Sequence, residues 1–341
     1  MKIEKNYDIT ELNTFGVKAR AKFFCRIESE DELGELMNTQ EFKENPKLFL
    51  GGGSNVLFTR DFEGIVVLNN IRGIEILSEE SDSVLIKAYG GEVWHDLVEF
   101  AVERGYWGIE NLSLIPGSVG GAPMQNIGAY GAELKDVFHS LEAVDVETGG
   151  KKIFLKEECQ FGYRDSVFKR ELKDKYFILS ITLKLSKKEA KSIKYKVLHD
   201  YLEKNNIEVK RPSDVSQAVV SIRRSKLPDP KVIGNAGSFF KNVLLHQERD
   251  KDKIQKLFQL YPEAPSFKEG EFIKIPSAWL IEECGLKGKR RGRAGVHDRQ
   301  ALVLVNHGGA TGEEIKKLAE EIIDSVYSKF GIKLMPEVNL I

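Results

Sequence analysis

The segment Ile115-Pro-Gly-Ser-Val-Gly-Gly-Ala-Pro-Met-Gln-Asn-Ile-Gly-Ala-Tyr-Gly131 decides the class of fold to which this sequence is assigned. It contains five glycines and two alanines but no charged side chain. A surface linker of this length would be more polar. A backbone with so few bulky side chains can instead wrap closely around a flat or extended ligand. A glycine-rich packing loop between domains is the structural alternative.

A second glycine-rich segment, Leu50-Gly-Gly-Gly-Ser-Asn-Val56, follows a strand predicted over residues 47–50. Consecutive glycines let backbone N–H groups converge on an anion such as a pyrophosphate, and Ser54 and Asn55 add donors. A tight turn between strands is the alternative. The segment is neither a dinucleotide fingerprint, because Val56 replaces the third glycine, nor a phosphate-binding P-loop. Two such loops together favour a nucleotide-like cofactor.

Length and charge limit the function classes. A chain of 341 residues is longer than a single hydrophobic core usually spans, so two or three domains are expected. The 51 Lys and Arg residues balance 52 Asp and Glu residues, which excludes polyanion or membrane-surface binding driven by bulk charge. An apolar content of 41% and a charged content of 30% are typical of globular proteins.

The N-terminal segment, the lengths of the apolar runs and the spacing of the cysteines predict a cytoplasmic protein. The N-terminal segment has no apolar core of a signal peptide, and no apolar run reaches the length of a membrane span. Cys25, Cys159 and Cys284 are too far apart for a disulfide framework or a zinc site of CxxC spacing. The histidines show no metal-binding spacing, so no metal is expected.

Apolar periodicity predicts an α+β pattern. Strands are predicted over residues 47–50, 64–68, 83–89, 140–146, 152–155 and 176–185, and a helix over residues 92–104. The second half is richer in helices, predicted over residues 188–204, from a cap at 213–214, over 246–260 and over 278–284. A strand is predicted over residues 301–306, and Thr311 and Glu314 form a capping box for a long helix that ends at Gly331. Residues 332–341 read as a final strand.

Three polar side chains are candidates for chemistry. Arg164, in Gly162-Tyr-Arg-Asp-Ser166, could clamp a carboxylate or form a surface pair with an aspartate. Ser238 precedes two phenylalanines, which could shield a proton donor from water, although a turn serine has the same surroundings. Glu337 lies in an apolar segment and could be a half-buried acid or an exposed edge glutamate.

The run Lys287–Arg293 holds five cations in seven residues and is the best argument for a nucleic-acid-binding protein. It lacks interleaved aromatic residues. A small molecule with phosphates would need one or two of these charges.

Several separated motifs together closely resemble the UDP-N-acetylenolpyruvoylglucosamine reductase family. In chain order they are Leu12-Asn-Thr-Phe-Gly16, the two glycine-rich segments, Gly162-Tyr-Arg-Asp-Ser166, Gly234-Asn-Ala-Gly-Ser-Phe-Phe-Lys241 and Pro336-Glu-Val338. The resemblance covers nearly the full chain. It implies an α+β fold with a vanillyl-alcohol-oxidase (PCMH) type FAD-binding domain in two subdomains and an α/β substrate-binding domain. The subdomains would span residues 1–70, with the strand 332–341 returning to the flavin site, and 71–210. The substrate domain would span residues 211–331.

The resemblance also implies the cofactor and its contacts. FAD would be bound by Gly52, Gly53, Ser54, Asn55, Ser118, Gly121, Gln125, Asn126 and Arg223. NADPH would reduce the flavin and leave, and the enolpyruvyl nucleotide would then accept hydride at its vinyl methylene. Arg164 would bind the substrate carboxylate, Glu337 would assist as an acid, and Ser238 would protonate the carbon next to the carboxylate.

The substrate UDP-N-acetylglucosamine enolpyruvate would be contacted by Tyr163, Tyr195, Lys226, Asn242, Lys287 and Gln300. Tyr195 lies in an extra segment that marks the longer type of the family. Phe267 stands where some members have a substrate-binding tyrosine, so a hydroxyl contact is lost there while a ring stack is kept. The product, UDP-N-acetylmuramate, would serve peptidoglycan precursor synthesis. A cytoplasmic monomer is expected, and another FAD-dependent oxidoreductase of the same superfamily is the alternative.

Overall fold

The computed structural model describes residues 1–189 and 193–341. The chain forms two units, each described by itself. The first comprises Met1–Tyr7, Arg20–Gly53 and Phe62–Ser225, and the second comprises Asp8–Ala19, Ser54–Asp61 and Lys226–Ile341. The three predicted domains stay a prediction.

The first unit begins with a four-stranded sheet of order β1-β2-β5-β3. Its strands are β1 (Ile3–Asp8), β2 (Arg20–Ile27), β3 (Lys47–Leu50) and β5 (Phe62–Asn69). Both β2 and β3 run parallel to β5, whose run Ile65-Val-Val67 is buried, as is typical of a central parallel strand. Helices α1 (Glu30–Met37) and α2 (Gln40–Glu44) connect β2 to β3 and bury Leu33, Leu36 and Phe42.

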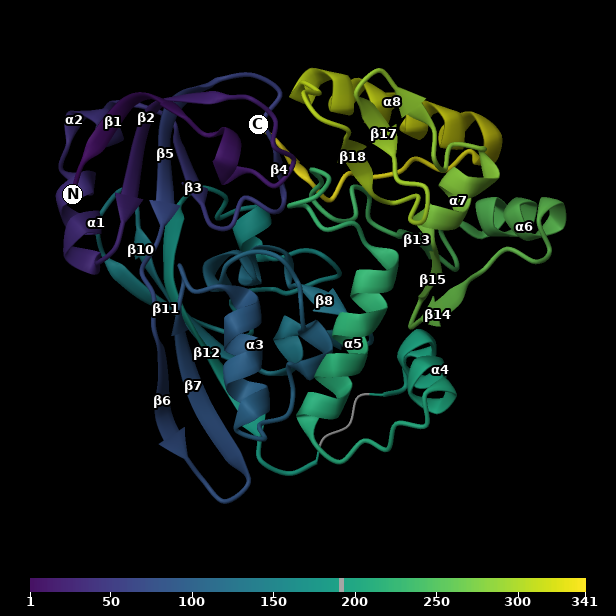
Figure 1. Ribbon diagram of the computed structural model, residues 1–341, viewed down its shortest axis with the longest axis horizontal. Coiled ribbons are helices and arrows are strands. Elements are labelled where there is room, and N and C mark those ends of the chain that lie inside the picture. Colours follow the sequence, from purple (N-terminus) through teal and green to yellow (C-terminus); the bar gives the residue numbers. More distant parts are fainter. Residues whose placement is uncertain (190–192) are drawn as a thin grey trace. The chain divides into compact units, whose positions relative to one another are not determined.

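The second sheet of this unit is antiparallel, with the order β11-β10-β12-β7-β6 (Figure 1). Its strands are β6 (Ile74–Glu79), β7 (Ser83–Tyr89), β10 (Phe138–Asp145), β11 (Lys151–Leu155) and β12 (Tyr176–Ser186). The central strand β12 joins two apolar clusters: Phe177 and Leu179 belong to one, while Ile181 and Leu183 belong to another that includes α3 (Trp94–Glu103). Its first half is an apolar run that is almost entirely buried, whereas in its second half apolar residues alternate with Thr182 and the exposed Lys184. The strands predicted here are confirmed.

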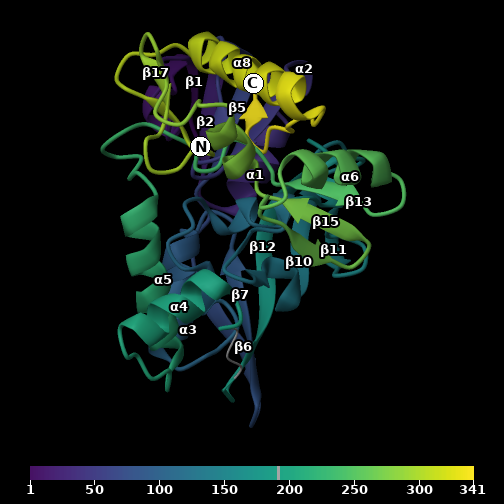
Figure 2. The same cartoon turned by 90° about the vertical axis from the view of Figure 1, so that its right-hand side faces the viewer.

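Helices α4 (Lys196–Lys204) and α5 (Pro212–Lys226) complete the first unit (Figures 1 and 2). Their apolar faces form a small cluster that includes Leu198, Leu202, Val219 and Ile222, together with Trp107. The predicted helix over residues 188–204 is therefore shorter, because it begins at Lys196; its residues 190–192 lie outside the described residues. A short hairpin, β8 (Gly128–Ala129) with β9 (Ala132–Glu133), lies in the glycine-rich segment.

The second unit contains three small sheets. Their orders are β13-β15-β14, β16-β17-β18 and β19-β4. The strands are β4 (Val56–Leu57), β13 (Val243–His246), β14 (Phe267–Glu269), β15 (Phe272–Ile275), β16 (Arg290–Arg291), β17 (Ala294–Val296), β18 (Leu304–Asn306) and β19 (Asn339–Leu340). The helices are α6 (Lys251–Leu260), α7 (Ser277–Glu283) and α8 (Gly312–Phe330), and α8 packs on β17 and β18 (Figure 1).

Three predicted elements of this unit are wrong in extent. The strand predicted over residues 301–306 is limited to β18, because residues 301–302 form a turn. The helix predicted over residues 246–260 begins at Lys251, because His246 ends strand β13 and its ring accepts the N–H groups of the following turn. The strand predicted over residues 332–341 is limited to Asn339–Leu340, where it pairs in parallel with β4. Among the described residues, no helix combines the length and apolarity that crossing a membrane requires.

Candidate functional site

In the first unit the two glycine-rich loops touch each other. A Cβ atom on Gly51 would lie 2.0 Å from the Ser118 Oγ atom, and one on Gly52 would lie 2.9 Å from the Gly117 Cα atom. The close approach therefore requires glycine at both positions. Gly53 has a left-handed backbone (φ +60°), and Gly52 and Gly121 are exposed. The structure thus brings Gly52, Gly53, Ser118 and Gly121 together in one glycine-lined segment.

A third glycine pair, Gly90-Gly91, was missed by the sequence reasoning. The Gly120 N–H donates to the Gly90 carbonyl at 2.8 Å, so this pair packs against the second glycine-rich loop. The signal that could have found it is two consecutive glycines directly after the period-two strand at residues 83–89.

The turn that contains Arg164 docks on the second glycine-rich loop. Asn126 Nδ2 donates to the Gly162 carbonyl at 3.0 Å, Ser166 Oγ donates to the Met124 carbonyl at 2.7 Å, and the Arg164 guanidinium donates to the Gly128 carbonyl. The Asn126 amide also donates to Glu133 and accepts from the Lys135 N–H, so its side chain is engaged within the protein. Both N–H donors of this amide are thereby engaged within the protein.

Backbone strain is concentrated in the same region. Leu114, Asn126, Tyr130 and Arg164 all have left-handed backbones, with φ between +46° and +57°. Such conformations cost free energy in residues other than glycine and cluster at sites where a side chain must be held in a defined place. The strain therefore marks the second loop and the Arg164 turn as one candidate site.

Arg223, on α5, brings a second guanidinium to this site. Its Nε atom is buried and has no hydrogen-bond partner among the described residues. Burial lowers the pKa of Arg223; the neighbouring Tyr130 opposes this effect and the charge of Arg164 adds to it. A buried guanidinium donor without a partner, near a second guanidinium, suits an anionic or strongly accepting ligand.

Three further predicted residues lie in this unit. The ring of Tyr163 has the Arg164 guanidinium carbon 5.6 Å from its centre, and the ring of Tyr195, 45% exposed, contacts Tyr130 edge to face. The Gln125 amide oxygen accepts from Lys169 at 3.3 Å.

In the second unit the predicted proton donor and acid lie on neighbouring extended segments. The Glu337 N–H donates to the Phe239 carbonyl at 2.8 Å, and Phe240 pairs with Pro336. Phe239 and Phe240 are each 1% exposed, so the apolar wall beside Ser238 is present. Ser238 and Glu337 are themselves half-buried.

The first glycine-rich loop continues into this second unit. Asn55 Nδ2 donates to the Glu337 carbonyl at 3.4 Å, and the Asn55 carbonyl accepts from the Asn339 N–H at 3.0 Å. Asn55 therefore ties the loop to the C-terminal segment that carries Glu337. Ser54, next to it, is half-buried.

The other residues of this unit that were predicted to contact substrate lie on separate segments. Asn242 Oδ1 accepts the Ser277 N–H at the start of α7, and Lys287 pairs with Glu282 at 3.0 Å. Gln300 lies in the turn before Leu302, whose carbonyl accepts the Phe239 N–H. Lys226 and Phe267 are exposed.

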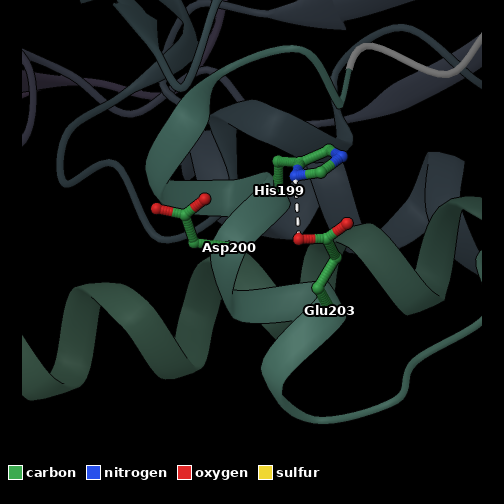
Figure 3. A group of neighbouring side chains, drawn as sticks. All are labelled: His199, Asp200 and Glu203. Atoms are coloured by element: carbon green, nitrogen blue, oxygen red, sulfur yellow. Dashed lines mark ion pairs between the residues drawn. The ribbon is translucent and has the colours of Figure 1, made fainter.

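A group of ligand-type side chains on α4 was not predicted (Figure 3). His199 Nδ1 lies 3.4 Å from a Glu203 oxygen in an i,i+4 ion pair, and Asp200 lies beside them. All three side chains are exposed, as in an ordinary pair on a helix surface. We assign no metal to this group.

Sequence comparison identifies both parts of the chain. Residues 21–151 match an FAD-binding domain, and residues 229–341 match the C-terminal domain of UDP-N-acetylenolpyruvoylglucosamine reductase. The predicted fold class, an α+β chain with a PCMH-type FAD-binding domain, is confirmed, and so is FAD as the cofactor.

The residues of the first unit fit such a cofactor. The two loops meet where Gly51 and Gly52 lack a Cβ atom, and backbone N–H groups of glycine-rich loops are the donors that bind a pyrophosphate. The partnerless Nε of Arg223 provides a donor for a flavin acceptor.

Solved structures share the architecture. The UDP-N-acetylenolpyruvylglucosamine reductase of Thermus caldophilus superposes with a TM-score of 0.68 at 22% identity, covering 100% of this chain and 99% of the other. A solvent-stable cholesterol oxidase superposes with a TM-score of 0.51 at 11% identity, covering 98% and 86%. At these identities both show the fold alone.

Curated relatives are much closer in sequence. The UDP-N-acetylenolpyruvoylglucosamine reductase of Flavobacterium johnsoniae is 46% identical over the full length of both chains. That of Pseudomonas aeruginosa is 45% identical over 100% of this chain and 99% of its own. The chain therefore belongs to the UDP-N-acetylenolpyruvoylglucosamine reductase family.

Proposed function

We propose that the chain reduces the enolpyruvyl group of UDP-N-acetylglucosamine enolpyruvate to UDP-N-acetylmuramate with NADPH as the reductant. Its membership of the family makes it an FAD-containing oxidoreductase of peptidoglycan precursor synthesis. We further propose that it acts as a cytoplasmic monomer.

One observation supports the proposed chemistry most directly. The 2.8 Å hydrogen bond between the Glu337 N–H and the Phe239 carbonyl holds the segment of the proposed acid beside that of the proposed proton donor. The buried rings of Phe239 and Phe240 limit water beside Ser238. A serine can protonate only a strongly basic carbon, and this requires a dry environment.

When bound, FAD supplies hydride transfer from NADPH to the vinyl methylene. Hydride addition there leaves negative charge on the adjacent carbon and its carboxylate. Arg164 would bind that carboxylate, because a guanidinium matches it in geometry and charge. The turn around Arg164, anchored to the glycine loop at Gly162 and Ser166, limits the motion of the side chain before substrate arrives.

Ser238 would then donate its hydroxyl proton to the charged carbon, and Glu337 would assist as the acid. Each proton that leaves Ser238 has to be replaced from solvent before the next turnover.

The remaining predicted residues keep their proposed roles. Gly52, Gly53, Ser54, Asn55, Ser118, Gly121, Gln125, Asn126 and Arg223 would hold FAD. Tyr163, Tyr195, Lys226, Asn242, Lys287 and Gln300 would contact the substrate.

A two-step titration tests the function. The purified protein is expected to be yellow, to bleach with NADPH under anaerobic conditions, and to recover its colour with UDP-N-acetylglucosamine enolpyruvate. Bleaching without recovery would instead favour another FAD-dependent oxidoreductase of the same superfamily.

The variant Ser238→Ala separates the two half-reactions. Flavin reduction by NADPH should be unchanged, whereas reoxidation by the enolpyruvyl substrate should slow by about 10²- to 10⁴-fold, the usual contribution of a general acid. Stopped-flow absorbance measures both steps. The exposed Ser266→Ala is the matched control. Normal reoxidation in Ser238→Ala would remove the proton-donor role.

A further inference from the structure

Tyr130, at the end of the second glycine-rich loop, is held in a strained backbone conformation. Its φ of +50° is unfavourable for an aromatic residue. The buried Asn111 donates from Nδ2 to the Tyr130 carbonyl at 2.8 Å and so fixes this conformation. Strain of this kind persists where the position of a side chain matters.

The ring of Tyr130 connects the glycine loop to the α4–α5 pair. It packs against the apolar cluster of these helices, which includes Leu198 and Ile222. It also meets the ring of Tyr195 edge to face, with the ring centres 5.7 Å apart and the planes at 81°. This is the preferred geometry of an aromatic pair.

Much of the surface of Tyr195 is open to solvent. It directly precedes α4, and 45% of its surface is exposed. Burial raises the pKa of Tyr130, while the nearby Arg223 lowers it, so Tyr130 also adjoins the second guanidinium of the site. The Tyr130 ring thus lies beside Tyr195, which is proposed to contact substrate, and near Arg223, which is proposed to contact the flavin.

We propose that Tyr130 is a positioning residue that seats the Tyr195 ring for substrate binding. This inference rests on the proposed function, because the role of Tyr195 does. An edge-to-face pair changes an equilibrium constant by about 2- to 12-fold, which sets the size of the effect.

A double-mutant cycle on the FAD-loaded enzyme tests the proposal. The Kd of UDP-N-acetylglucosamine enolpyruvate is measured without NADPH, from the change in flavin absorbance on titration, for the wild type, Tyr130→Asn, Tyr195→Leu and the double variant. Asparagine removes the ring but tolerates a left-handed backbone. Tyr130→Asn should raise Kd about 3- to 10-fold in the wild type but not in the Tyr195→Leu background. Tyr130→Phe, which keeps the ring, should restore binding.

The result that overturns the proposal is an equal rise of Kd in both backgrounds. If Tyr130→Asn fails to retain FAD, Tyr130→Gly, which also removes the ring and adopts a left-handed backbone, replaces it in the same cycle. The control is Tyr176→Leu, which removes an edge contact with Phe154 elsewhere in this unit and should leave Kd unchanged. A wild type that binds FAD but not this substrate would refute the proposed function itself, and with it this role of Tyr130.

Discussion

At the residue scale, glycine content and motif order found most of the candidate site, but not how its side chains are engaged. Asn126 was predicted from the sequence as a cofactor contact, yet its amide is used to join the second loop to the Arg164 turn. A sequence lists the donors of a loop, whereas their partners depend on which distant segment docks there. Tyr130 escaped notice for the same reason, because nothing local links it to Tyr195.

Glu110 gives a pH-dependent prediction at this scale. The residue is 1% exposed and its carboxylate accepts the Gly108 N–H at 2.6 Å. Burial raises the pKa of Glu110, and the backbone donors only partly offset this. Because the folded pKa lies above the unfolded one, its stabilising contribution is complete below the unfolded pKa and is lost as pH rises through the folded pKa.

Glu110→Gln should remove that dependence. As pH rises from about 4.3, the wild type should lose stability relative to the variant. The difference between their free energies of unfolding should change by at most about 1.4 kcal/mol per pH unit. Urea unfolding at a series of pH values measures this difference. Glu103→Gln, at an exposed position of α3, is the control. A constant difference between Glu110→Gln and wild type across the range would contradict the prediction.

At the element scale, capping and periodicity predicted local structure well, and tertiary pairing set the limits of the elements. The capping box at Thr311 and the stop at Gly331 are confirmed for α8, because both signals act within one turn. The helix predicted from His246 is shorter because His246 pairs in β13 with β15 and residues 247–250 form the turn that follows. The last strand is short because its ladder with β4 covers Asn339–Leu340, whereas Pro336 makes an isolated bridge with Phe240, and no local pattern identifies either partner.

The capping box of α8 can be tested directly. Thr311 Oγ1 accepts the Glu314 N–H at 3.2 Å, and a Glu314 oxygen accepts the Thr311 N–H at 2.7 Å. Thr311→Ala should lower the free energy of unfolding by about 1 kcal/mol, whereas Thr311→Ser should cost much less. Thermal or urea unfolding compares the two variants. Equal stability of the alanine variant and the wild type would show that the cap is not needed.

At the scale of the whole molecule, the order of motifs established the family although it left the division of the chain unresolved. The predicted start of the substrate domain at residue 211 stays a prediction, and in the structure α5 packs with α4 and Trp107 in the first unit. Likewise the first glycine-rich loop divides between units, with Gly53 in one and Ser54 in the other. Such divisions follow from packing between distant segments and have no signature in a linear pattern.

The glycine loops lead to a prediction for the molecule as a whole. A ligand that binds only the folded chain stabilises it by about 2.7 kcal/mol when its free concentration is 100 times its Kd. FAD should therefore raise the Tm of protein stripped of flavin, in a concentration-dependent way. Riboflavin has the same ring system but no pyrophosphate, so at equal concentration it should raise the Tm much less if the loops at Gly51 and Ser118 hold the pyrophosphate. Differential scanning calorimetry measures both, and equal shifts would mean that the loops serve packing alone.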